Sequence, residues 1–279
     1  MGQIILGFIL LVGFAFTSFE VEAAEDESDE HIQQLSKIID DHSPESLMQN
    51  FERVGGNPLA FHQAKCFFDK YGNNKFLDAD TPKGIEIKNK KFVVITDLTI
   101  PSNRPRLFLL NLETRVVKAY MVAHGLGIPG AEVTLYEQGK INPKDLPNIL
   151  FPKLVSNKPG SKATSRGAFI LGDSYFGSFG YSLRQHGLQK DINDNVMKRL
   201  VVMHGLKGMN PFTVSSSDAD QQPFPEGNLA TSQGCSMLEP SQAKEVIDAA
   251  KGGSLYYIFS EQEKKLGSSY CADQNLQLK

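Results

Sequence analysis

Cys235 lies in a short segment whose residue types could support nucleophilic catalysis. The segment reads Thr-Ser-Gln-Gly-Cys-Ser-Met over residues 231–237 and follows a loop rich in glycine and proline. Gly234 can adopt backbone conformations that are closed to other residues, and it leaves room for a substrate carbonyl to approach the thiol. A cysteine attacks as its thiolate, and an ordinary thiol pKa of about 8.5 leaves only a small thiolate fraction at neutral pH. Cys235 therefore requires a base.

Histidine can serve as that base because its pKa lies close to neutrality. The sequence contains six histidines, which are His31, His42, His62, His124, His186 and His204. The first three lie in the acidic N-terminal segment or on predicted helices, which favours surface or packing roles. The other three each precede a glycine, and His204 also ends an apolar run that predicts a strand. Because strand ends present side chains to clefts, we expect His204 to be the base.

Other kinds of hydrolytic site have less support in the sequence. There is no His-Glu-x-x-His motif, no Cys-x-x-Cys pair and no pair of histidines spaced four residues apart. A zinc site built from His124, His186, His204 and an acidic residue is a minor alternative. No serine stands in a Gly-x-Ser-x-Gly turn, and no phosphate-binding loop is visible. We therefore expect neither a metal nor another cofactor.

The N-terminus has the features of a secretory signal. Residues 4–16 form an almost unbroken apolar run, and the small residues Val21 and Ala23 follow it at a suitable cleavage site. The run is shorter than the roughly 20 residues that span a bilayer. The sequence thus predicts a cleaved signal peptide over residues 1–23, no stable membrane anchor, and export to the bacterial periplasm or cell envelope.

Composition and cysteine content agree with an exported globular enzyme. The formal net charge of −3 gives no support to a nucleic-acid partner, which would favour a basic face, and 41% hydrophobic residues can form a sizeable core. The three cysteines, Cys66, Cys235 and Cys271, are an odd number for an oxidising compartment. Three pairings are possible, and all three thiols could also be reduced. We favour a bond between Cys66 and Cys271, because the turn around Cys235 is of a kind that exposes a side chain.

Residues 24–88 are predicted to form an acidic leader and a small helical unit. One helix is expected from Ser43, as N-cap, to about Val54, where two glycines follow. Another is expected from Pro58 to Tyr71. The unit could pack on the rest of the chain or bind a partner.

Residues 89–279 are predicted to form a β-rich domain, which gives an α+β fold class. Short runs rich in apolar and β-branched residues, separated by Asn, Gly and Pro, predict strands at residues 91–96, 106–112, 116–123, 167–171, 199–204 and 255–259. One clear helix is expected over residues 240–252. The predicted base therefore ends a strand, and the predicted nucleophile lies between strands and this helix.

The order of these motifs resembles the L,D-transpeptidase (YkuD-like) family, in particular its murein L,D-transpeptidase catalytic domain branch. The resemblance covers about residues 92–259. It is carried by Ser-Arg-Gly-Ala-Phe at 165–169, Tyr-Phe-Gly at 175–177, Tyr-Ser-Leu-Arg-Gln-His-Gly-Leu at 181–188, Val-Met-His-Gly at 202–205 and Ser-Gln-Gly-Cys at 232–235. The last two motifs are the most specific in this order and spacing.

The sequence also departs from the family's common pattern. That pattern is Ser/Thr-His-Gly-Cys with Asn or Arg two residues later, whereas here Gln233 replaces the histidine and Met237 replaces the polar residue. Gln233 cannot act as a base, so this role falls to His204. The interval between the two motifs is longer than usual, and we interpret residues 209–230 either as a loop over the site or as a simple insertion.

The resemblance implies mixed β-sheets around a cleft and activity as an L,D-transpeptidase on peptidoglycan stem peptides. The cysteine would attack the carbonyl of the third stem residue and release the terminal D-Ala. An amine of a neighbouring stem would then resolve the thioester into a 3–3 cross-link, or a free D-amino acid would be exchanged into the stem. With water as acceptor the protein would be an L,D-carboxypeptidase or endopeptidase, and the sequence does not choose among these acceptors.

The resemblance also implies roles for individual residues. Cys235 would be the nucleophile, and His204 would form a thiolate–imidazolium pair with it. The N–H groups of Gly234 and Cys235 would hold the oxyanion, and Ser232 would orient His204 through its backbone carbonyl. The expected substrate-binding residues are Arg184, Ser182 and Tyr175. An inactive wall-binding homologue, or a thiol or zinc enzyme of another class, remains an alternative.

Overall fold

The computed structural model describes residues 46–78, 81, 83–125, 127, 150–152, 154–207, 213–217, 231–267, 276 and 278. These residues belong to one compact unit. The predicted signal peptide lies outside them, as does the predicted loop 209–230 apart from residues 213–217. A large mixed sheet with few helices forms the described chain, which confirms the predicted α+β fold class. The boundary predicted between residues 88 and 89 stays a prediction.

Helix α2, Leu47–Arg53, begins later than the sequence predicts. Its N-cap is Ser46, whose hydroxyl accepts a hydrogen bond from the Gln49 N–H at 3.1 Å. The predicted N-cap, Ser43, lies outside the described residues. Ser46 is 5% exposed, so the hydrogen bond of the cap is made in a buried environment.

Three further helices have well-defined starts. Helix α3, Pro58–Tyr71, has the predicted bounds, with the Asn57 side chain capping its first turn. Helix α5, Pro240–Ala250, is capped by the Glu239 carboxylate, and helix α6, Glu261–Leu266, follows the last strand. Proline occupies the first position of α3 and α5, where its missing N–H costs no helical hydrogen bond.

The main sheet has nine strands in the order β10-β5-β4-β3-β13-β7-β8-β9-β12. Their bounds are Thr213–Ser215 (β10), Val117–Tyr120 (β5), Leu107–Asn111 (β4), Phe92–Asp97 (β3), Ser254–Phe259 (β13), Gly167–Gly177 (β7), Gly180–Gly187 (β8), Val202–Gly205 (β9) and Ser236–Leu238 (β12). Strand β13 runs parallel to β3 and antiparallel to β7. The C-terminal strand therefore joins the two halves of the sheet.

Two small sheets accompany the main one. Strands β1, Lys75–Phe76, and β2, Ile85–Glu86, form an antiparallel pair. Strands β6, His124–Gly125, and β11, Thr231–Ser232, form a parallel pair. The second pair brings β11, which directly precedes the turn of Cys235, against the segment that follows β5.

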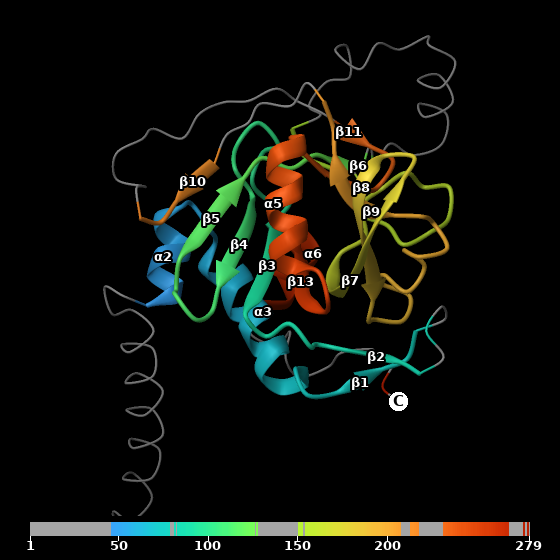
Figure 1. Ribbon diagram of the computed structural model, residues 1–279, viewed down its shortest axis with the longest axis horizontal. Helices are drawn as coiled ribbons and strands as arrows, with labels where there is room; N and C mark the ends of the chain where they lie inside the picture. The colour runs from blue at the N-terminus through green and yellow to red at the C-terminus, as the bar shows by residue number, and fades with distance from the viewer. Residues whose placement is uncertain are drawn as a thin grey trace, which may run out of the picture. The chain divides into compact units, whose positions relative to one another are not determined.

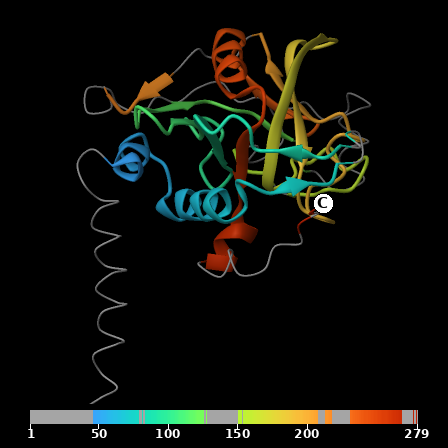
Figure 2. The same ribbon diagram turned by 60° about the horizontal axis from the view of Figure 1, so that its bottom comes forward.

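The two faces of the main sheet pack against different helices (Figures 1 and 2). Helix α5 lies across one face, where it covers a buried cluster that includes Met203 and Leu238. Helices α2 and α3 cover the other face, where Phe51 packs on Phe108 with ring centroids 4.6 Å apart. The predicted helical unit therefore shares one hydrophobic core with the sheet and packs on the rest of the chain.

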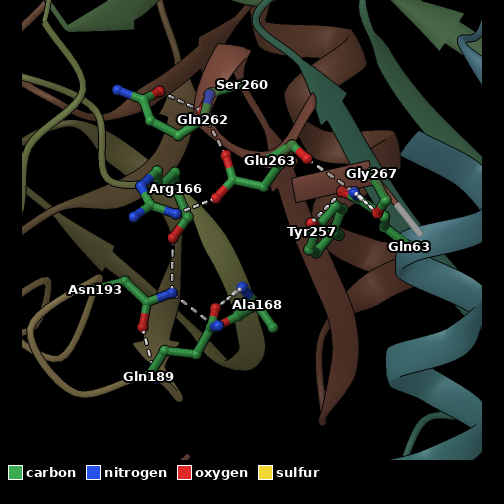
Figure 3. Close-up of polar contacts among 10 residues, drawn as sticks. All are labelled: Gln63, Arg166, Ala168, Gln189, Asn193, Tyr257, Ser260, Gln262, Glu263 and Gly267. Atoms are coloured by element: carbon green, nitrogen blue, oxygen red, sulfur yellow. Dashed lines mark hydrogen bonds and ion pairs between the residues drawn. The ribbon is translucent and has the colours of Figure 1, made fainter. Parts of the chain in front are cut away.

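A polar network ties helix α3 to the C-terminal part of the chain and to the segment after β8 (Figure 3). The Glu263 carboxylate is fully buried and accepts hydrogen bonds from Arg166 and Ser260. Gln63 of α3 donates to the Glu263 and Gly267 carbonyls at 2.9 and 2.8 Å. Such buried polar groups are stable only when they are fully paired.

The same network continues to the segment that precedes β9 (Figure 3). Asn193 donates to the carbonyls of Arg166 and Ala168 at 2.8 and 2.9 Å, and Gln189 accepts from the Ala168 N–H at 2.7 Å. The segment that leads into the predicted base is therefore anchored to β7 on one side and, through Glu263, to the C-terminal helix.

Cysteine pairing is consistent with a free thiol at the predicted nucleophile. Cys66 is disulfide-bonded, and Cys235 is a free thiol. Cys271 lies outside the described residues. Among the described helices, none has the length and apolar character needed to cross a membrane.

Candidate active site

Cys235 lies in the turn between β11 and the edge strand β12. Gly234 has φ 118°, and a Cβ at this position would lie 2.9 Å from the Ala163 carbonyl oxygen, so another residue would be strained here. The Ser232 hydroxyl donates to the Cys235 carbonyl at 2.7 Å and accepts from the Gly234 N–H at 3.0 Å. Cys235 is 8% exposed, and its thiol donates to the Leu200 carbonyl at 3.9 Å.

His204 lies on β9, directly opposite Met237 of β12. Its Nδ1 is 2.9 Å from the Gly205 carbonyl oxygen. Because a carbonyl only accepts, Nδ1 carries the proton, and in the neutral ring Nε2 keeps a lone pair that can accept another. The Phe179 ring stacks on the imidazole at 4.4 Å. A Cβ at Gly205 would lie 2.8 Å from the Pro240 Cα, which explains the glycine of the His-Gly motif.

These contacts correct two expected roles. Ser232 was expected to orient His204, but the carbonyl that holds the imidazole belongs to Gly205. The hydroxyl of Ser232 instead braces the turn of the thiol, because β11 runs beside β6 and does not pair with β9. The Gly234 N–H was expected in the oxyanion hole, but it donates to that hydroxyl.

The expected substrate-binding residues lie on strands β7 and β8, in cross-strand register with His204 or with Val202 of β9. Tyr175 of β7 is opposite Ser182 of β8, which is opposite His204. Arg184 is opposite Val202, which packs with Cys235 in a small buried cluster. Because residues opposite each other point to the same face of a sheet, these side chains share the face that carries the imidazole.

Among these residues, Arg184 and Ser182 have different surroundings. The guanidinium of Arg184 lies 4.5 Å from the centre of the Tyr175 ring, which fixes its position at the surface. Ser182 is 1% exposed, and its hydroxyl donates to the Gly180 carbonyl at 3.1 Å. This contact differs from the expected substrate-binding role, because the hydroxyl is used to close the β7–β8 hairpin.

A cavity of about 750 Å³ lies beside these strands. Charged side chains of both signs line it, among them Arg184, Asp173 and Glu86. Leu200 also lines it, while the backbone carbonyl of the same residue accepts the hydrogen bond of the Cys235 thiol. Neither Cys235 nor His204 lines the cavity, so Leu200 is the lining residue that connects it to the thiol.

The two other histidines that precede glycines have partners of their own. His124 is buried with Nδ1 2.7 Å from the Arg106 guanidinium, and burial, followed by that charge, lowers its pKa to about 2. His186 Nδ1 lies 2.9 Å from the Asp78 carboxylate. Among the described residues, no group of three or more His, Cys, Asp and Glu is placed so that it could hold a metal ion.

The electrostatic environment favours uncharged forms of both candidate groups. Burial lowers the pKa of His204, and the hydrogen bond to Gly205 opposes this shift. Burial raises the pKa of Cys235, while a backbone hydrogen bond from Val202 and the charge of Arg199 lower it. Both directions oppose the expected thiolate–imidazolium pair, because burial disfavours the charged form of each group.

Sequence reasoning missed two residues that touch the site. Phe179 stands at the tip of the β7–β8 hairpin and is 57% exposed, although its ring covers His204. Arg199 precedes β9 and interacts electrostatically with Cys235. A basic residue directly before an apolar strand was a visible signal for Arg199, whereas nothing in the sequence indicates which ring stacks on the imidazole.

One family profile and several solved structures are similar to this chain. A family profile described as L,D-transpeptidase catalytic domain matches residues 73–259. Among solved structures, an L,D-transpeptidase from Mycobacterium smegmatis is 12% identical with a TM-score of 0.30, covering 60% of this chain and 58% of that one. The helical cell shape determining protein Pgp2 (K307A mutant) from Campylobacter jejuni is 11% identical with a TM-score of 0.34, covering 76% and 61%.

A third solved structure, L,D-transpeptidase 1 of Mycobacterium tuberculosis, is 11% identical with a TM-score of 0.28, and 60% of each chain is covered. The chain thus spans about three fifths of the length of these three proteins. No curated protein matches the sequence.

Proposed function

Because the chain belongs to the L,D-transpeptidase catalytic domain family, we propose that it acts on peptidoglycan stem peptides through a thioester on Cys235. The observation that carries this proposal is the register of β9 and β12. His204 is paired with Met237, two residues after the free thiol, and its Nδ1 is fixed by a carbonyl. A thiol in the turn before β12 and an oriented imidazole on the neighbouring strand β9 supply the nucleophile and the base that acyl transfer requires.

In the proposed reaction, Nε2 of His204 accepts the thiol proton as the sulfur of Cys235 attacks the carbonyl carbon of the third stem residue. The bond from that carbon to the nitrogen of the terminal D-Ala then breaks, and the nitrogen leaves with the proton from the imidazolium. The neutral imidazole next takes a proton from the acceptor, whose nitrogen or oxygen attacks the thioester. Cleavage of the carbon–sulfur bond returns the thiol.

The pKa directions support general-base catalysis in this proposal. A histidine with a lowered pKa stays neutral and able to accept a proton at neutral pH. The buried thiol stays protonated until the base removes its proton. Since the Gly234 N–H is engaged by Ser232, we assign the oxyanion to the Cys235 N–H.

Substrate binding is proposed for the cavity that Arg184 and Leu200 line, with the scissile bond reaching past it toward Cys235. Arg184 lines it with a fixed positive charge suited to a carboxylate of the stem, and Tyr175 holds that charge in place. Because peptidoglycan is part of the cell wall, we propose that the protein acts in the cell envelope. The signal peptide predicted over residues 1–23 would direct its export.

The proposal is tested by incubating the mature protein with tetrapeptide muropeptides and reading the products by mass. Transfer gives released D-Ala together with a dimer or an exchanged D-amino acid, whereas hydrolysis gives tripeptide alone. Cys235→Ala and His204→Ala are expected to abolish all products, while His62→Ala, an exposed histidine on α3, leaves them unchanged. Unchanged tetrapeptide with the wild-type protein would count against the proposal.

A second candidate is a wall-binding homologue without activity. The burial of Cys235 and the raised pKa of its thiol favour this reading, because an inert cysteine has the same properties. Sedimentation with purified peptidoglycan separates the two, since a binder cosediments whether or not Cys235 is present and releases no D-Ala.

A further inference from the structure

Arg199 is held by hydrogen bonds next to the turn that carries Cys235. Its Nη1 donates to the Ser156 carbonyl at 2.9 Å and to the Ser165 hydroxyl at 2.7 Å, and its Nη2 donates to the Ala163 carbonyl. These acceptors come from one segment, residues 156–165, that also packs against Gly125 of β6. The guanidinium therefore links the start of β9 to this segment.

The same guanidinium lies against the residue that precedes the thiol. A Cβ at Gly234 would lie 3.2 Å from Nη2 of Arg199 and 2.9 Å from the Ala163 carbonyl oxygen. Only a glycine leaves the guanidinium this close to the backbone of the turn. The charge of Arg199 opposes the effect of burial on the pKa of Cys235.

The residue after Arg199 adds an independent observation. Leu200 has φ 55°, a left-handed conformation that is unfavourable for a leucine, and its side chain is 78% exposed. Its carbonyl accepts the hydrogen bond from the Cys235 thiol. Strained backbone of this kind persists where surrounding contacts hold it, and it gathers at functional sites. Arg199, which makes three hydrogen bonds, holds the backbone next to Leu200 in place.

The charge of Arg199 is not balanced by another ion in the described structure. Its three acceptors are two carbonyls and a hydroxyl, all neutral, and no carboxylate of the described residues forms an ion pair with it. Arg199 is half-buried, and even partial desolvation of a cation without a counter-ion is unfavourable, although the guanidinium is hydrogen-bonded. A thiolate at Cys235 would supply the missing negative charge.

We propose that Arg199 is a positioning residue for Cys235: it holds the turn of residues 232–235 against residues 156–165 and supplies the fixed positive charge that favours the thiolate. The inference rests on the proposed role of Cys235 as nucleophile, but it concerns the ionisation of the thiol and not the identity of the substrate.

The test is the rate of alkylation of Cys235 by iodoacetamide as a function of pH, followed by mass on the full mature chain. Arg199→Gln and Arg199→Met are two neutral variants, and either one that keeps the wild-type thermal midpoint decides. Arg199→Lys keeps the charge, Lys198→Gln is an exposed control on the same turn, and Cys235→Ala reports labelling elsewhere.

In the neutral variants we expect the inflection of the rate to move up by about one pH unit, with the same limiting rate at high pH. This shift lowers the alkylation rate near neutrality about tenfold, since one pKa unit is a tenfold change in thiolate. Arg199→Lys is expected to restore most of the rate, and Lys198→Gln to match the wild type.

An inflection that stays in place in the neutral variants would overturn the inference. So would an equal loss of rate at every pH, because it would mean that only access to the thiol changed. The experiment uses no peptidoglycan. A shifted inflection together with inert muropeptides would therefore refute the proposed function while leaving the role of Arg199 supported.

Discussion

Replacing Ser232 by alanine separates two roles that this residue could have beside Cys235. In the structure its hydroxyl makes two hydrogen bonds, at 2.7 Å to the Cys235 carbonyl and at 3.0 Å to the Gly234 N–H. All three residues are buried. Ser232→Ala leaves a donor and an acceptor without partners in the interior.

The cost follows from those two groups. A buried polar group that loses its partner costs about 1–3 kcal/mol, so the loss of two partners should lower the free energy of unfolding by at least roughly 2 kcal/mol. Domains of this kind have about 5–15 kcal/mol in total, so the variant remains folded. Urea unfolding measures the loss, with Ser217→Ala, an exposed serine, as the matched control.

The titration of His204 distinguishes the two roles. If Ser232 braces only the turn of the thiol, the imidazole of His204 titrates in Ser232→Ala as it does in the wild type, when followed by NMR. Ser232→Thr, which keeps the hydroxyl, should recover much of the stability. A loss below about 0.5 kcal/mol, the range of surface substitutions, would refute the reasoning. A shift of the His204 titration would show that the Ser232 hydroxyl also affects the imidazole.

Three further predictions concern burial and charge. Phe179→Ala should return water to the His204 imidazole and raise its lowered pKa toward about 6.5, moving the acid limb of kcat/KM upward. Phe176→Ala, on the same hairpin but 83% exposed, should leave the limb in place, and equal shifts in both variants would contradict the stacking argument. The pKa of His124 is about 2 in the folded chain, so its imidazole stays neutral while the unfolded chain takes up a proton below about pH 6.5. The free energy of unfolding should therefore decrease as the pH is lowered below about 6.5, by up to about 1.4 kcal/mol per pH unit from this group. His124→Asn keeps a hydrogen-bond acceptor and should flatten this dependence in urea unfolding at several pH values; an unchanged slope would show that His124 does not contribute to it. Glu263→Gln should cost about 3–5 kcal/mol by thermal unfolding, because it breaks a buried ion pair and leaves its guanidinium partner uncompensated; a loss below about 1 kcal/mol would place the pair among weak surface contacts.

Local patterns in the sequence predict much of the fold. Helix α3 has the predicted bounds because its proline start and glycine end are local signals. Strand β9 begins three residues later than predicted, since the left-handed conformation of Leu200 interrupts the run. Strand β8 is not among the predicted strands, because Gln185 is polar although it lies buried on the same face as Leu183, and this breaks the alternation of a half-buried strand.

The candidate site was predictable in its residue types but not in its contacts. Cys235 and His204 could be selected because a glycine-flanked turn and a strand end are visible locally. The partner of Nδ1 of the histidine depends on how closely Gly205 approaches Pro240, which is a tertiary property. Arg199 shares this limitation, because its acceptors lie 34 to 43 residues away in sequence.

The central position of β13 has a consequence for the order in which the chain can fold. Strands β10, β5, β4 and β3 reach the remaining strands of the main sheet only through this C-terminal strand. Until residues 254–259 are available, β3 and β7 each have an unpaired edge, and the long-range pairings that close the sheet cannot form. During synthesis or export from the N-terminus, the complete sheet therefore cannot form until residues 254–259 are available. A chain that ended before β13 would have two half-sheets, each with an exposed edge strand prone to aggregation.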